Sequence, residues 1–377
     1  MSIRSDPQPL SSAPRVTVVI PHFNYGRYLP TAVASALSQP SVDVDVIIVD
    51  DASTDGSAAV ARRLAEDDPR VTLIEHATNL RHIASYNDGL AAASGDYVVL
   101  LSADDALAPG SLARSTALME AHPAVGLVYG NARTFTDSPP GSGGVGGGGV
   151  GGVGGGGVGG VGGGGGGGGA APVSWRGAHE SWTVWRGDEW LDLISRRGRN
   201  VITNPEVVMR RDVLTEIGGY DIRFPHSADL FLWLRAAARS DIGRVNGTIQ
   251  AFYRVHDTNM HTTQFGGVLD DYSAVRDTFD AFFEEDGGLL HDSEQLRGRA
   301  RRAIAREALR RTVLLPDPEP AASAESLIDF AAASDPSDWL ARTAYRRGLQ
   351  LGLRKPLGAV EAIRWRFRYQ RELRYGT

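Results

Sequence analysis

The 377-residue sequence contains no cysteine, and this absence limits the chemistry that the chain can perform. Without cysteine there is no disulfide framework, no thiolate metal site and no cysteine nucleophile, which suits a reducing compartment. No apolar run approaches the roughly 18 to 20 residues that cross a bilayer. Residues 1–15 also lack the apolar core of a signal peptide. These absences together predict a cytoplasmic protein.

Lysine is almost missing, since Lys355 is the single lysine among 39 basic residues. Positive charge is also unevenly distributed: residues 342–377 hold ten basic and two acidic residues, although the whole chain carries a net charge of −6. An anionic partner is therefore expected at the C-terminal end of the chain.

The basic tail has the pattern of an amphipathic helix that begins near Pro356. Its apolar residues lie along one predicted face, and arginines alternate with aromatic residues after them; the apolar set is Leu357, Val360, Ile363 and Phe367, extended by Trp365, Tyr369 and Leu373. Such a helix suits an anionic membrane surface, on the inner face of the cell membrane. It could equally dock on the acidic remainder of the protein, and nucleic acid is not an expected partner.

From Val16 onward, short β-branched runs alternate with helical patterns, which predicts an α/β fold with a mostly parallel sheet flanked by helices. The expected strands are 16–20, 44–50, 71–75 and 96–101, and the expected helices between them are 29–39, 53–65 and 83–93. From Asp270 onward the pattern is helical. Because functional groups of parallel sheets gather beyond the carboxyl ends of the strands, residues 21–25, 50–55 and 102–105 are expected to converge.

Four tryptophans follow a glycine-rich stretch: Trp175, Trp182, Trp185 and Trp190. Buried aromatic packing is the favoured interpretation, and a surface on which sugars stack is the alternative.

Two pairs of adjacent aspartates follow predicted strands, Asp50–Asp51 and Asp104–Asp105. Carboxylates at strand ends can accept hydrogen bonds from the N–H and hydroxyl groups of a ligand, but aspartates are also common in turns. Adjacent carboxylates are poorly tolerated without a cation or hydroxyl donors between them. A hard divalent ion, Mg²⁺ or Mn²⁺, together with diphosphate oxygens would fit such a pair.

Four segments, in this order and spacing, resemble glycosyltransferase family 2, the inverting enzymes with the GT-A fold: PHFNYGRYL, VIIVDDASTDGS, NDGLAAASGDYVVLLSADD and GGYDIRFPHSADLFLWLR. The resemblance spans about Val16 to His256. It implies a Rossmann-like nucleotide-binding half, transfer of a sugar from a nucleotide-diphosphate donor to an acceptor hydroxyl with inversion, and a divalent metal. The acceptor is expected to be a lipid-linked glycan or a cell-surface polysaccharide precursor.

The resemblance also assigns roles to single residues. Phe23 matches an aromatic residue beside the nucleobase, and Asp51 matches the carboxylate that binds the base. Asp104 would contact the ribose and Asp105 the metal, although the family also allows the reverse assignment. His256 could complete the metal shell. The wider donor-binding set implied in this way is Pro21, Phe23, Asn24, Asp50, Asp51, Asn79, Asn87, Asp104 and Arg254.

Asp229 is the expected general base, because inverting displacement needs a carboxylate that takes the acceptor proton. A helix N-cap is its structural alternative. The sequence departs from the family at Ser102, where many members have another aspartate, and at Ala228, where glutamate is usual. At Arg81 the family frequently has glycine.

The resemblance divides the chain into five parts: a disordered N-terminal tail (1–14), the nucleotide-sugar-binding half (15–136), a disordered Gly-rich insertion (137–172), the acceptor-binding half (173–268) and a helical C-terminal region (269–377). Residues 141–169 contain only Gly, Val and one Ser, a composition that buries too little surface to order a backbone.

Two other functions remain open from the sequence. Ser102 and Ala228 favour a catalytically inactive carbohydrate-binding or scaffold protein, whereas the acidic residues that are present argue against it. A sugar-1-phosphate nucleotidyltransferase would have a related sheet, but it opens with a glycine-rich phosphate loop and a lysine, where this chain has PHFNYG.

Overall fold

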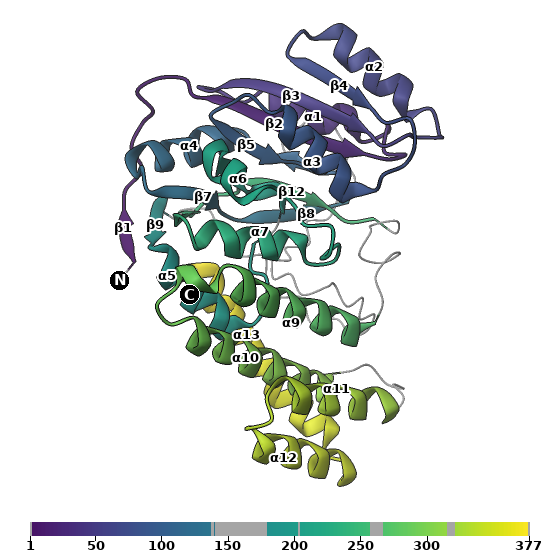
Figure 1. The fold of residues 1–377 in the computed structure, drawn as a ribbon, viewed down its shortest axis with the longest axis vertical. Coiled ribbons are helices and arrows are strands. Elements are labelled where there is room, and N and C mark those ends of the chain that lie inside the picture. Colours follow the sequence, from purple (N-terminus) through teal and green to yellow (C-terminus); the bar gives the residue numbers. More distant parts are fainter. Residues whose placement is uncertain are drawn as a thin grey trace. The chain divides into compact units, whose positions relative to one another are not determined.

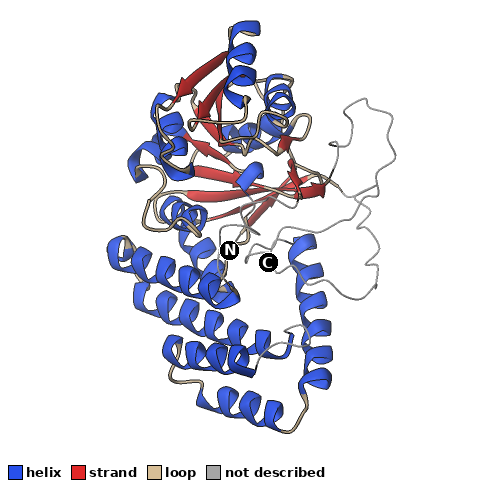
Figure 2. Ribbon diagram, turned by 90° about the vertical axis from the view of Figure 1, so that its right-hand side faces the viewer, coloured by secondary structure: helices blue, strands red, loops and turns tan. Residues whose placement is uncertain are grey.

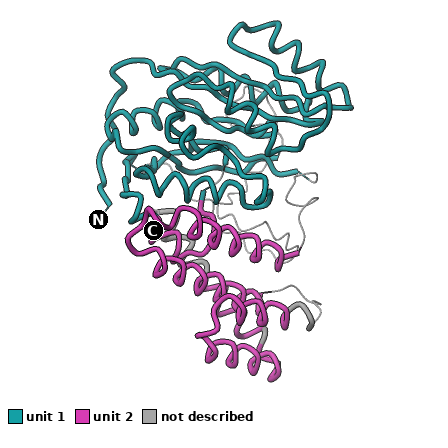
Figure 3. The backbone as a smooth tube through the Cα atoms, in the orientation of Figure 1, with its two compact units in different colours: residues 1–156, 169–190, 202–257 teal, residues 157–168, 191–201, 258–377 magenta. Residues whose placement is uncertain are grey.

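The computed structural model describes residues 2–136, 139, 179–202, 204–256, 267–314 and 321–375. These residues form two compact units (Figure 3). The first takes the described residues within 1–156, 169–190 and 202–257, and the second those within 191–201 and 258–377. The insertion expected at 137–172 lies outside the described residues, apart from residue 139.

The first unit is built on a nine-stranded sheet (Figure 1). Its strands lie in the order β1 (Ile3–Ser5), β9 (Ser181–Trp185), β11 (Asp241–Asn246), β7 (Val125–Tyr129), β10 (Val208–Arg210), β5 (Tyr97–Leu100), β2 (Arg15–His22), β3 (Asp43–Asp50) and β4 (Val71–Glu75). Strands β5, β2, β3 and β4 pair in parallel, whereas β10 is antiparallel to both of its neighbours. The parallel part carries the carboxyl ends at which the sequence predicts a site.

Helices cover both faces of this parallel part (Figure 2). Because neighbouring side chains of a strand point to opposite faces, Val18 and Ile20 pack with α1 (Leu29–Leu37) in one core, and Val19 faces α3 (His82–Ala92). Gly89 permits close approach of α3, since a Cβ atom there would lie 2.3 Å from Val19 Cγ1. The other helices of this unit are α2 (Ser57–Asp67), α4 (Ser111–Ala121), η1 (Asn204–Glu206), α6 (Arg211–Ile217) and α7 (Ala228–Ala237), with α5 (Gly187–Arg197) shared between the units.

A second, three-stranded sheet contains β6 (Ala106–Leu107), β12 (Ala251–Arg254) and β8 (Ala132–Phe135). Strand β12 is antiparallel to β6, with Phe252 opposite Ala106, and parallel to β8. This pairing brings the segment after β12 beside the aspartates that precede β6.

The N-terminal residues differ from the expectation of a disordered tail over 1–14. Residues Ile3–Ser5 form β1, which pairs antiparallel with β9 at the edge of the large sheet. The expectation was wrong for these residues because an edge strand offers unpaired backbone groups that a short segment of almost any composition can complete.

Of the four tryptophans that crowd the stretch after the glycine-rich segment, the three that the structure describes are packed in the core, as favoured from the sequence. Trp182, Trp185 and Trp190 are each at most 4% exposed, so they offer no open surface to a sugar. Trp175 lies outside the described residues.

The second unit is helical: α9 (Val268–Glu285), η2 (Gly287–Leu289), α10 (Ser293–Leu314), α11 (Ala321–Ser334), α12 (Trp339–Gln350) and α13 (Arg354–Tyr375). One side of α13 lies against α10, where Glu361 is buried and its Oε2 is 3.5 Å from Arg310 Nε. Val360, Ile363 and Phe367 on the same helix are 47%, 58% and 76% exposed. Within the described part of the chain, no helix combines the length and the apolar character needed to span a membrane.

Candidate active site

The first strand-end pair, Asp50 and Asp51, is buried at the carboxyl end of β3. His22 lies opposite Asp50 in the β2–β3 register, with its Nε2 3.3 Å from Asp50 Oδ1. Burial lowers the pKa of the His22 imidazole, against the opposing charges of Asp50 and its neighbours, so the ring is neutral at pH 7. Asp50 also accepts the Ser53 N–H at 3.3 Å. Its contacts therefore hold the strand end and the turn.

The Asp51 carboxylate organises the loop between β4 and α3. Its Oδ1 accepts the Leu80 N–H at 2.7 Å, and its Oδ2 accepts the Arg81 N–H at 2.8 Å. His76 Nδ1 lies 2.8 Å from Oδ1, and the Asn79 amide donates to the Asp51 carbonyl at 3.1 Å. Since a carboxylate offers about four lone-pair positions, Asp51 has capacity for one further donor. It can thus hold the loop and still accept an N–H from a ligand.

Strained backbone gathers after three neighbouring strands. Asn24 after β2, Ala52 after β3 and Arg81 after β4 have φ values of 60°, 60° and 73°. Arg81 combines its φ with a ψ of 165°, a conformation essentially reserved for glycine, which costs other residues on the order of 1–3 kcal/mol. This explains physically why the family frequently has glycine at this position. Such strain clusters at functional sites, where the surrounding contacts enforce it.

The loop after β2 is tied to the loop after β3. Asn24 donates its N–H to Ser53 Oγ at 3.0 Å, and its side-chain oxygen accepts the Thr54 N–H at 2.8 Å. Pro21, near the end of β2, is half-buried, and the Phe23 side chain is 40% exposed. An exposed aromatic ring held between tied loops is available for stacking on a planar ligand.

The second strand-end pair meets the segment after β12. Asp105 Oδ1 accepts the Arg254 N–H at 2.8 Å, and the Arg254 guanidinium donates to the Asp104 carbonyl at 2.8 Å. That guanidinium also lies over the Tyr28 and Phe135 rings. Arg254 therefore holds the acidic turn in place.

Asp104 and Asp105 could hold a divalent cation together with His256. His256 Nε2 is 3.0 Å from Asp104 Oδ2, and Asp105 Oδ2 is buried with no hydrogen-bond partner. Burial raises the pKa of Asp105 well above its ordinary value, and the charge of Asp104 raises it further. An orphaned carboxylate oxygen in a repulsive pair is what a cation would satisfy, so these residues fit Mg²⁺ or Mn²⁺.

No point within the described ranges gathers three or more His, Asp or Glu side chains for a metal.

Asp229 begins α7 and is held by a tyrosine that sequence reasoning missed. Tyr220 donates its hydroxyl to Asp229 Oδ1 at 2.6 Å. Asn87, expected to lie near the donor, uses both ends of its amide on the Tyr220 backbone, at 2.8 and 2.9 Å. The GGYD segment contains Tyr220, but nothing in that segment separates a site role for the tyrosine from core packing.

Tyr86 on α3 lies between the acidic turn and Asp229. Its hydroxyl is 3.3 Å from Ser102 Oγ, and its ring centroid is 5.1 Å from that of Tyr220. Burial raises the pKa of Tyr86, and the charges of Asp229, Asp105 and Asp104 raise it further. Tyr86 thus contacts Ser102, beside the acidic turn, and Tyr220, which bonds Asp229.

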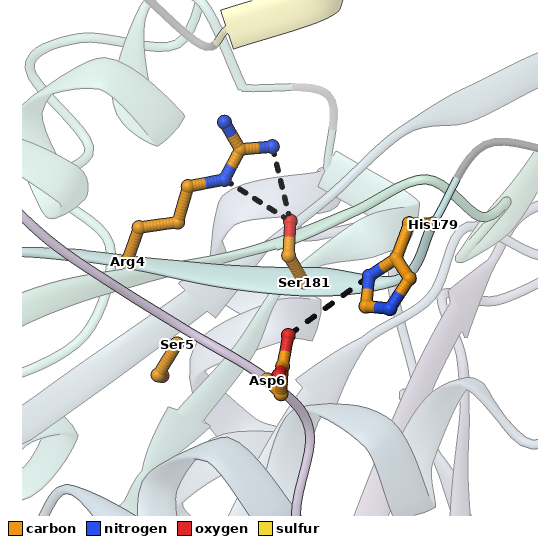
Figure 4. A pocket seen from close by; sticks show the side chains of 5 residues that line it. All are labelled: Arg4, Ser5, Asp6, His179 and Ser181. Atoms are coloured by element: carbon orange, nitrogen blue, oxygen red, sulfur yellow. Dashed lines mark hydrogen bonds and ion pairs between the residues drawn. The ribbon is translucent and has the colours of Figure 1, made fainter.

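A separate pocket lies at the far edge of the large sheet, lined by Arg4, Ser5, Asp6, His179 and Ser181 (Figure 4). The Arg4 guanidinium donates to Ser181 Oγ at 3.2 Å. His179 and Asp6 are 3.9 Å apart and largely exposed. This pocket holds none of the residues expected to act in catalysis.

Part of the chain is similar to known glycosyltransferases. Residues 17–143 match the family model described as "Glycosyl transferase family 2". The putative glycosyltransferase EpsE of Bacillus subtilis is 37% identical over 114 residues, 30% of this chain and 41% of that protein. A GalNAc(5)-diNAcBac-PP-undecaprenol beta-1,3-glucosyltransferase of Campylobacter jejuni is 33% identical over 119 residues, 31% of this chain and 38% of that protein. The matches span less than half of the length of these relatives.

The fold resembles that of a solved structure, S. aureus TarS residues 1–349 in complex with UDP-GlcNAc. The TM-score is 0.58 at 15% identity, and the match covers 89% of this chain and 92% of that one. The GT-A fold expected from the sequence is confirmed by this likeness. Residues 17–143 therefore belong to glycosyltransferase family 2, on a fold of the GT-A type.

Proposed function

We propose that the chain is an inverting glycosyltransferase that moves a sugar from a nucleotide-diphosphate donor to an acceptor hydroxyl. The observation that carries this proposal is the series of contacts from Ser102, beside the acidic turn, through Tyr86 and Tyr220 to Asp229. Residues 17–143 also match the family model. One carboxylate, Asp229, stands apart from the acidic pair on a separate helix. This separation allows Asp229 to act on the acceptor while the acidic pair acts on the donor.

The donor site uses the ends of β2 to β5. The nucleobase stacks on Phe23 and gives an N–H to the remaining lone pair of Asp51, and Asn24 and Asn79 keep the surrounding loops in place. Asp50 shapes this edge by accepting the Ser53 N–H, and Pro21 lies near the end of β2. Asn87 acts indirectly, by holding Tyr220. The ribose and diphosphate lie toward Asp104 and Arg254.

The reaction is a single displacement. The acceptor oxygen attacks the anomeric carbon from the face opposite the diphosphate, the bond to the diphosphate oxygen breaks, and the acceptor proton passes to the Asp229 carboxylate. Asp104 and Asp105, with His256 beside Asp104, would hold a divalent cation, and that cation would supply positive charge for the departing diphosphate when bound. Arg254 keeps the acidic turn at the position where that charge develops.

A thermal-shift panel of UDP-, GDP-, CMP- and dTDP-linked sugars, with and without Mn²⁺, tests the donor site. A ligand that binds the folded chain stabilises it, by about 2.7 kcal/mol at a hundredfold excess over Kd. One nucleotide is expected to raise the midpoint by about 5 °C in the presence of metal. Binding without release of nucleoside diphosphate on adding acceptors would favour the inactive scaffold, and no shift with any donor would contradict the donor site.

We also propose that α13 binds an anionic membrane, where a lipid-linked glycan would be presented as acceptor. Its exposed residues Ile363 and Phe367 stand on a strongly basic segment, and one relative's name specifies an undecaprenol-linked substrate. Each basic residue near anionic headgroups contributes about 1 kcal/mol. The chain is expected to sediment with phosphatidylglycerol vesicles and not with phosphatidylcholine vesicles. Replacing both Ile363 and Phe367 by aspartate is expected to abolish sedimentation, and unchanged sedimentation would contradict this role of α13.

A further inference from the structure

The Tyr220 side chain bonds Asp229 directly and is itself held by several contacts. The Tyr220 hydroxyl lies 2.6 Å from Asp229 Oδ1, at the short end for an O–H···O bond. The residue is 5% exposed and its ring packs against Tyr86. Asn87 fixes its backbone from both sides. Each contact comes from a different part of the chain, so Tyr220 has little freedom to move.

A second amide, that of Asn204, contacts the hydroxyl groups of both tyrosines. Asn204 Nδ2 lies 3.4 Å from the hydroxyl oxygens of both Tyr86 and Tyr220. Because the Asn204 amide donates to both hydroxyl oxygens, the two hydroxyl protons are available for other partners. The Tyr220 hydroxyl donates to Asp229, and the Tyr86 hydroxyl can donate to Ser102 Oγ. The result is a chain of polar contacts from the acidic turn to Asp229.

The proton in the short bond belongs to the tyrosine. Burial raises the pKa of Tyr220 well above its ordinary value, and the Asp229 charge raises it further, so the phenol stays protonated at neutral pH. An ionised carboxylate can only accept. A donated hydrogen bond favours the charged form of a carboxylate and so lowers its pKa.

We propose that Tyr220 is a positioning residue that fixes Asp229 Oδ1 and keeps the carboxylate ionised. This inference rests on the proposed function, in which Asp229 is the base. It assigns to Tyr220 the orienting role that a third group plays for many catalytic bases.

Tyr86 on α3 packs against Tyr220, and burial raises its pKa, which the charges of Asp229, Asp105 and Asp104 raise further. Arg235, further along α7, donates to the Ile217 carbonyl at 2.5 Å. Removing the Tyr220 hydroxyl leaves all of these in place, so a changed pH profile would report the lost bond.

The test is Tyr220→Phe, compared with wild type and Tyr97→Phe. Tyr97 supplies a matched control, because its hydroxyl also donates to a carboxylate, that of Glu120, and it lies at the opposite end of β5 from Ser102. For Tyr220→Phe we expect kcat to fall about 10- to 100-fold, the donor KM to stay within about twofold, and the acid limb of kcat/KM to move upward by about one pH unit. Tyr97→Phe is expected to change only thermal stability.

Incorporation of 2,3-difluorotyrosine at position 220 keeps the ring and the hydroxyl, so it remains informative if Tyr220→Phe does not fold. Fluorine makes the hydroxyl a stronger donor, and the acid limb is expected to move downward. The role of Tyr220 would be contradicted if Tyr220→Phe behaves like Tyr97→Phe, or if the acid limb of the fluorinated protein does not move. If Asp229→Asn is inactive in the same assays, the assignment of Asp229 as the base is unaffected. If Asp229→Asn is as active as wild type, the proposed base itself is wrong.

Discussion

Replacing Asp229 by asparagine is expected to lower kcat by about two to four orders of magnitude, the usual contribution of a general base. Asparagine has the shape of aspartate and still offers an oxygen to the Tyr220 hydroxyl, which lies 2.6 Å from Oδ1. It cannot take the acceptor proton. Since Asp229 lies on α7, away from the β2 to β4 strand ends, donor KM is expected to remain within about twofold. Nucleoside diphosphate release at saturating donor measures both quantities.

Asp212 provides the control for this change. Both residues lie in the first turn of a helix, Asp212 in α6 and Asp229 in α7, where a negative charge interacts favourably with the helix dipole. Asp212→Asn removes the same charge from an exposed position and is expected to leave kcat unchanged. If Asp229→Asn keeps more than about a tenth of the activity, or if both variants lose activity equally, the charge at α7 serves the helix and not the reaction.

The parallel strands could be predicted because their residues are apolar on both faces. The expected strand 71–75 agrees with β4, and 16–20 lies within β2. A strand buried on both sides needs a continuous β-branched run, which a single sequence shows directly. Strand β1 could not be predicted in this way, because its pairing partner β9 lies some 180 residues away and its own residues are mostly exposed.

The strand-end aspartates could be predicted as a site, but their contacts could not. The segment VDDASTDGS predicts carboxylates at a strand end, yet the bonds from Asp51 to Leu80 and Arg81 depend on how a distant loop folds. Tyr86 and Tyr220 were missed for the same reason. Their hydroxyl partners, Ser102 and Asp229, become neighbours only when α3, β5 and α7 assemble.

Removing the Asp105 carboxylate is expected to abolish the metal-dependent part of donor binding without weakening the fold. In Asp105→Asn, the side-chain oxygen can still accept the Arg254 N–H, so the link between the acidic turn and β12 is kept. The buried Oδ2, which has no hydrogen-bond partner, becomes an amide without negative charge. A hard cation prefers anionic oxygen ligands, so the site loses affinity for Mn²⁺.

The expected results separate this role from a structural one. The Mn²⁺-dependent thermal shift with donor should disappear, and Mn²⁺ titration followed by electron paramagnetic resonance should show weaker binding, while the midpoint without ligand stays within about 2 °C of wild type. Turnover should fall at least about 100-fold, because the departing diphosphate would lose the positive charge that the metal supplies. Asp96→Asn, exposed before the start of β5, is the matched control and should retain every metal effect.

Two outcomes would contradict the metal site in different ways. An Asp105→Asn protein that keeps the full Mn²⁺-dependent shift would assign the cation to Asp104 and His256, which lie 3.0 Å apart, and would leave Asp105 as the anchor of Arg254. A wild-type protein that binds donor and turns it over equally well in chelator would show that Arg254 and its surroundings stabilise the diphosphate without metal. In that case the repulsion between Asp104 and Asp105 would have to be relieved by protonation of Asp105, the direction in which burial already moves its pKa.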